Sequence, residues 1–105
     1  MHGLRQFGVC LSTTNAFYLL QGLETLPLRM DAHVSNAMAV ATWLEQHPQV
    51  SWVRYAGLPS SPFAGLANRY LPRGTGSVFA FGVKGGRAGG ARFIEALELV
   101  SHLAN

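Results

Sequence analysis

The chain has 105 residues and a mass of 11.3 kDa, which allows one modest domain, because domains usually run to about 100–200 residues. Charged residues make up 12% of the chain and hydrophobic residues 49%, which excludes a disordered polyelectrolyte and indicates that part of the surface is normally covered by another surface. The net charge of +3 comes from scattered basic residues, so no nucleic-acid-binding patch is expected.

The cysteine content and the lengths of the apolar runs exclude further classes of protein. Cys10 is the one cysteine, so a disulfide framework is excluded and a reducing, cytoplasmic compartment is favoured. We expect Cys10 to be a small buried apolar residue. The longest apolar runs are five residues, whereas a membrane span needs about 20. Neither a membrane segment nor a signal peptide is therefore expected.

The first half of the chain has the spacing of two helices. Residues 12–15 are all helix-capping types, and apolar residues at helical spacing follow as far as Leu26. This pattern predicts a first helix that is buried on more than one side. Pro27 suits a first helical turn. A second helix is predicted over 27–47, with a core-facing stripe of Val34, Ala37, Met38, Ala41 and Leu44.

The second half changes to strand-like and loop-like sequence. Residues 50–55 are rich in β-branched and aromatic types and predict a strand. Residues 57–62 contain two prolines and two serines, which is typical of a loop, and 63–70 predicts a short helix. Residues 77–83 predict a second strand that is buried on both faces, because most of its side chains are apolar.

A glycine-rich turn over 84–90 is predicted to lead into a third long helix over 90–104. The turn could cradle a phosphate on free backbone N–H groups, or it could be a flexible connection. The helix runs to the end of the sequence without a capping glycine, and two strands rarely form a stable sheet alone. Both features predict a piece of a larger protein.

The chemistry-bearing residues do not assemble into an active site. Lys84 is the one lysine, and its place in a turn favours a solvated side chain over a Schiff base. The four histidines have no metal-ligand spacing. Trp43 and Trp52 are expected to be core or interface anchors. No catalytic, cofactor-binding or metal-binding residue is expected in this chain.

Several runs of the sequence resemble the Cys/Met-metabolism family of pyridoxal-phosphate (PLP) enzymes. The resemblance covers the entire chain, and the runs that carry it include residues 4–12, 19–30, 55–60, 81–86 and 101–105. The last two runs resemble the O-acetylhomoserine sulfhydrylase branch in particular. The implied fold is α/β, strictly an α+β piece of the PLP-dependent transferase fold.

The resemblance implies a division of the chain. Residues 1–26 would end the large PLP-binding domain, 27–47 would form a bridging helix, and 48–105 would begin the small C-terminal α/β domain. The Schiff-base lysine would lie upstream, and the arginine that holds the substrate carboxylate would lie beyond residue 105. Asn105 and Arg5 are implied to bind substrate: Asn105 beside the carboxylate and cofactor, and Arg5 near the entrance of the site.

The resemblance implies a parent enzyme that uses PLP and a small amino-acid substrate. It would convert O-acetyl-L-homoserine and sulfide to homocysteine and acetate, as a cytoplasmic homotetramer without nucleic-acid or membrane partners. The chain alone would bind no PLP. Methionine γ-lyase and cystathionine γ-synthase or lyase are alternatives within the family. A non-catalytic α/β interaction module is the alternative from another class.

Overall fold

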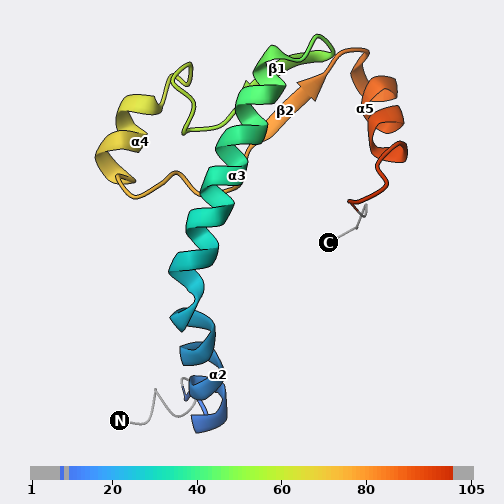
Figure 1. Ribbon diagram of the computed structural model, residues 1–105. Helices are drawn as coiled ribbons and strands as arrows, with labels where there is room; N and C mark the ends of the chain where they lie inside the picture. The colour runs from blue at the N-terminus through green and yellow to red at the C-terminus, as the bar shows by residue number, and fades with distance from the viewer. Residues whose placement is uncertain (1–7, 9, 101–105) are drawn as a thin grey trace.

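The computed structural model describes residues 8 and 10–100. Helix α3 forms the long axis of the molecule (Figure 1), with α2 at one end and the two strands, α4 and α5 gathered around the other. The elements of the described chain are α2 (Thr13–Glu24), α3 (Leu26–Gln46), β1 (Val50–Arg54), α4 (Ala64–Tyr70), β2 (Ala80–Val83) and α5 (Gly86–Glu95).

The two predicted N-terminal helices are confirmed as α2 and α3. Ser12 caps α2, since its side chain accepts a hydrogen bond from the backbone N–H of Asn15 at 3.2 Å. Thr25 separates the two helices, and Pro27 lies in the first turn of α3, where its missing N–H costs nothing. The guanidinium of Arg29 donates across the junction to the carbonyl oxygen of Gly22 at 2.9 Å.

The prediction that the first helix is buried is wrong for the described chain. No residue of α2 is buried, and its leucines and aromatics are exposed, with Leu20 at 63%. Helical spacing identifies the element, but it carries no information about whether a covering surface is present.

The core lies between the C-terminal half of α3 and strand β1. Ala37 and Ala41 of the predicted α3 stripe are buried together with Tyr55 and Leu58, and Ala41 is 0% exposed. Small side chains on the helix allow the strand to approach closely, so the stripe selects this face for packing. The partly buried side chains around the cluster are Met38, Val53 and Phe79.

Strands β1 and β2 pair in antiparallel register, with Val53 opposite Phe81 and Arg54 opposite Ala80. The second strand is shorter than predicted, because residues 77–79 lie outside β2. Its predicted burial on both faces is also wrong, since Ala80 is exposed and the other three residues of β2 are only partly buried. The described sheet has two strands, and α5 contacts β2 through the edge-on pair of Phe81 and Phe93, whose ring centres lie 5.5 Å apart.

Helix α5 begins and ends earlier than the predicted helix over 90–104. The turn is confined to Lys84 and Gly85, which has a left-handed φ of 92°, and the later glycines of the predicted turn are helical. The helix ends at Glu95. Phe93 and Ile94 of this helix are 40% and 39% exposed. The low helix propensity of glycine predicted a turn. In the structure Gly89 lies inside α5, because glycine has no side chain and can approach the carbonyl of Lys84 closely.

The described residues contain no helix that is both long enough and apolar enough to cross a membrane.

Gly89 and Gly90 offer a matched test of the contact between α5 and the turn before it. A methyl group at Gly89 would press on the backbone carbonyl of Lys84, whereas one at Gly90 would meet nothing within 4 Å. We expect Gly89→Ala to destabilise the fold by about 1–3 kcal/mol through overpacking. Gly90→Ala should instead stabilise it by up to about 1 kcal/mol, because alanine is the better helix former. Urea unfolding of both variants would show this. Equal urea midpoints for the two variants would contradict the contact between Gly89 and the carbonyl of Lys84.

Candidate functional site

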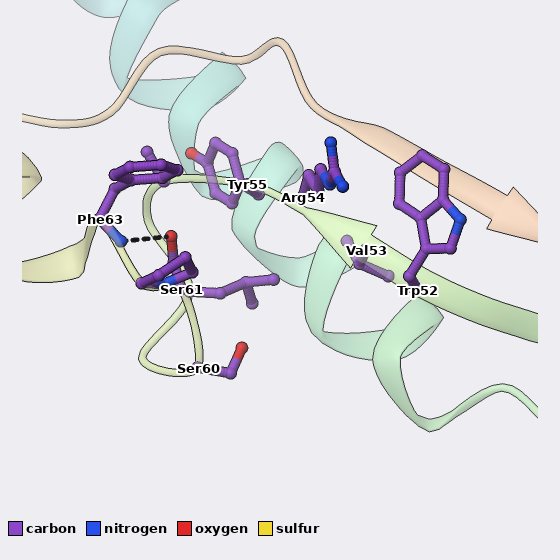
Figure 2. A pocket seen from close by; sticks show the side chains of 10 residues that line it. Trp52, Val53, Arg54, Tyr55, Ser60, Ser61 and Phe63 are labelled. Carbon is purple, nitrogen blue, oxygen red and sulfur yellow. Dashed lines mark hydrogen bonds between the residues drawn. The ribbon is translucent and has the colours of Figure 1, made fainter.

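A pocket of about 600 Å³ lies where β1 ends and the loop to α4 begins. Figure 2 shows the loop side chains Ser60, Ser61 and Phe63 at one end of the pocket and Trp52 at the other. Its walls are mostly apolar, and Arg54 is the one formally charged residue that lines it. The lining residues are Trp52, Val53, Arg54, Tyr55, Ala56, Leu58, Ser60, Ser61, Pro62 and Phe63.

Trp52 and Arg54 form one side of this site because alternate residues of a strand share a face. The guanidinium carbon of Arg54 lies 5.2 Å from the centre of the Trp52 ring, which is within the range of a cation–π contact. The Trp52 indole also covers Gly82 on the paired strand, where a Cβ would collide with it. The two side chains therefore hold each other on the sheet surface.

Tyr55 connects the pocket to the core. Its side chain is 3% exposed, and its hydroxyl donates to the carbonyl oxygen of Gly76 at 2.7 Å. The Phe79 ring meets the Tyr55 ring edge-on, with 5.9 Å between the ring centres. These contacts tie the segment before β2 to the end of β1.

The two serine hydroxyls of the pocket are already engaged in holding the loop. The backbone N–H of Phe63 donates to Ser61 Oγ at 3.2 Å, as the dashed line in Figure 2 marks. Ser60 Oγ donates to a carboxylate oxygen of Glu45 on α3. A nucleophilic hydroxyl requires an adjacent general base, and no histidine lines this pocket. The contacts of both hydroxyls hold the loop in place, and Ser60 is tied to α3 through Glu45.

The histidines of the described chain do not converge either. His47 ends α3, and its Nδ1 accepts a hydrogen bond from the backbone N–H of Gln49 at 3.2 Å. Its ring lies 4.8 Å from that of Trp43. Within residues 8 and 10–100, no group of three histidine, cysteine or acidic side chains could hold a metal ion.

Two further expectations have clear outcomes. Cys10 is exposed, so the prediction that it is buried is wrong; it precedes α2, where nothing described packs over it. Trp43 and Trp52 are 60% and 47% exposed, so they are not core anchors, and their expected role as interface anchors stays a prediction. Trp52 and Arg54 line the pocket although the sequence did not single out that pair; their spacing of two on a predicted strand was the available signal.

Arg5 and Asn105, the two implied substrate-binding residues, lie outside the described residues. Their roles stay predictions.

The described residues do not fit a PLP site. A lysine forms a Schiff base through its neutral amine, which a desolvated pocket or a neighbouring cation favours. Lys84 is exposed on the turn before α5 and does not line the described pocket. Its backbone N–H donates to the carbonyl oxygen of Gln49 at 2.7 Å, which closes the end of the sheet. The backbone of Lys84 therefore helps to close the sheet. Its side chain does not lie in the described pocket, where a cofactor could be oriented against it.

Comparison with known proteins places this scaffold in a family. The profile of the Cys/Met metabolism PLP-dependent enzymes matches residues 2–105. The chain belongs to this family.

The relatives narrow the class to enzymes of sulfur amino-acid metabolism. A homocysteine synthase of Schizosaccharomyces pombe is 50% identical over 97% of this chain and 24% of its own length. O-acetyl-L-homoserine sulfhydrylase 1 of Thermus thermophilus is 47% identical over 98% of this chain and 24% of its own. The chain thus spans about a quarter of the length of these relatives.

A solved structure shows the same arrangement of elements. The O-acetylhomoserine sulfhydrylase of Wolinella succinogenes superposes with a TM-score of 0.84 and 36% identity. The match covers 97% of this chain and 29% of that one. The described fold is therefore that of a segment within a PLP-dependent sulfhydrylase.

Tyr55 allows a test of the hydrogen bond that joins β1 to the segment before β2. We expect Tyr55→Phe to destabilise the fold by about 1–2 kcal/mol, because the carbonyl of Gly76 loses its partner in a partly buried place. Tyr70→Phe is the matched control, since Tyr70 is 67% exposed and should shift stability by less than about 0.5 kcal/mol. Chemical denaturation measures both variants. A loss in the control as large as in Tyr55→Phe would contradict the assignment.

Proposed function

We propose that this chain contributes to a PLP-dependent O-acetylhomoserine sulfhydrylase, which converts O-acetyl-L-homoserine and sulfide to homocysteine and acetate. The observation that carries the proposal is 47–50% identity, over almost the whole chain, to enzymes named for this activity. PLP, when bound, supplies the electron sink for such chemistry. The reaction belongs to methionine biosynthesis and takes a small amino acid as substrate.

Within that enzyme the chain is proposed to supply scaffold rather than reacting groups. Residues 1–26 would close the large domain, 27–47 would bridge the domains, and 48–105 would start the small one. The unbroken helix α3, Leu26–Gln46, supports the bridging role. The core between α3 and β1 supports a separate small domain that begins at the end of that helix.

The finer parts of the proposal concern contacts beyond the described residues. Arg5 is proposed to lie at the entrance of the substrate site, and Asn105 beside the substrate carboxylate. We propose a cytoplasmic homotetramer, which the low charge and the exposed apolar surface support.

The experiment is an assay of the complete enzyme that contains this chain, purified with PLP. Homocysteine should form from O-acetyl-L-homoserine and sulfide. O-succinyl-L-homoserine as the only acyl donor accepted would move the enzyme to another sulfhydrylase specificity. Release of a thiol from methionine, without homocysteine synthesis, would favour methionine γ-lyase. Cystathionine synthesis or cleavage alone would favour the remaining family alternatives. Absence of all these activities would favour a non-catalytic interaction module.

Lys84 gives a prediction for the chain by itself. We expect the 105-residue chain, mixed with equimolar PLP and reduced with borohydride, to carry no stoichiometric adduct at Lys84, because that side chain is exposed on a turn. Peptide mapping by mass spectrometry measures the adduct. Lys84→Arg is the control and sets the background of the assay. A stoichiometric adduct on Lys84 would contradict the prediction.

A further inference from the structure

The pocket at the end of β1 has the size and the firm inner wall of a small-molecule site. Its volume of about 600 Å³ lies within the range of roughly 300–1,000 Å³ that is usual for such sites. Two of its lining residues, Tyr55 and Leu58, belong to the core and are 3% and 1% exposed. The Tyr55 hydroxyl is held on the carbonyl oxygen of Gly76 at 2.7 Å. The inner wall therefore has a fixed shape before any ligand binds.

The charge of the lining indicates the sign of the ligand. Arg54 is the one formally charged residue in the lining, and no acidic residue accompanies it. Its guanidinium carbon lies 5.2 Å from the centre of the Trp52 ring, and this contact holds the cation at the cavity. A guanidinium pairs with a carboxylate through two parallel N–H bonds. One cation in an otherwise neutral wall favours a ligand with one negative charge.

The rest of the wall favours an apolar, aromatic body for that ligand. Aromatic rings stand at both ends of the cavity, Trp52 at one and Phe63 at the other (Figure 2). They are 47% and 62% exposed, so a ring packed against them would remove apolar surface from water. The hydroxyls of Ser60 and Ser61 already hold the loop. The wall therefore offers few positions to a polar ligand body.

Two other classes of small molecule fit this lining less well. A free amino acid carries an ammonium group, and no carboxylate lines the pocket to pair with it. A phosphorylated compound carries about two negative charges at neutral pH, against one arginine in the lining. Each would leave a charge unpaired beside an apolar wall, which is costly.

We propose that this pocket binds a small aromatic monocarboxylate. The carboxylate pairs with the guanidinium of Arg54, and the ring packs on the apolar wall toward Phe63. The inference uses the shape and charge of the pocket and does not rest on the reaction proposed above.

The test measures the binding of 2-naphthoate to the complete enzyme that contains this chain, by isothermal titration calorimetry. We expect a Kd below about 1 mM. The neutral analogue 2-naphthamide should bind at least about 10-fold more weakly, because it lacks the charge that pairs with the arginine. No detectable binding of 2-naphthoate, or equal binding of the amide, would overturn the proposal.

Two matched arginine variants locate the bound ligand. Arg54→Gln should weaken 2-naphthoate binding at least about 10-fold, because a hydrogen-bonded charged partner is lost. Arg69→Gln is the control and should leave binding unchanged. The guanidinium of Arg69 lies over the Tyr70 ring at 5.3 Å, in the same kind of contact, but Arg69 does not line the pocket. Phe63→Ala should also weaken binding, since the ring loses its aromatic contact. Binding that Arg54→Gln leaves unchanged would place the ligand elsewhere in the enzyme and overturn the proposal.

Discussion

The packing of Tyr55 and Leu58 against the alanine stripe of α3 is the contact on which the rest of the described structure depends. Ala41 is fully buried beneath them, so any larger side chain there would push β1 off the helix. From this contact the Tyr55 hydroxyl reaches Gly76, which brings the segment before β2 alongside. The sheet, the pocket and the loop to α4 all take their positions from it.

The same contact explains why the two ends of the molecule differ. Around β1, helix, strand and loop cover one another, and Glu45 of α3 holds Ser60 of the loop. Around α2 nothing described makes a comparable contact, and its apolar side chains stay exposed. Burial of such side chains is the main stabilising term in folding. The relatives that this chain matches are about four times as long as the match.

The pocket shows how a scaffold segment can contain a cavity without reactive chemistry. Its hydroxyls hold the loop, and Arg54 lies over the Trp52 ring. The exposed turn lysine, Lys84, has no place in it. Within the described residues, α3 carries the small sheet away from α2 as one continuous helix (Figure 1).

Local sequence determined most of the helices and the position of β1. Capping by Ser12, the proline at position 27 and the stripe ending at Leu44 are signals within one or two helical turns. The ends of β2 and α5 were not predictable in this way. Glycine has low helix propensity everywhere, and only the close approach of Gly89 to Lys84 shows why glycines stand inside α5.

By itself, the sequence determined the type and order of the elements and the family through its motifs, because these depend on residue identity and short-range spacing. Tertiary structure decided which apolar faces are covered. Leu44 and Leu20 have the same helical periodicity, yet Leu44 is 6% exposed and Leu20 is 63% exposed. Burial depends on what lies opposite a side chain, and a residue's own spacing does not encode that neighbour.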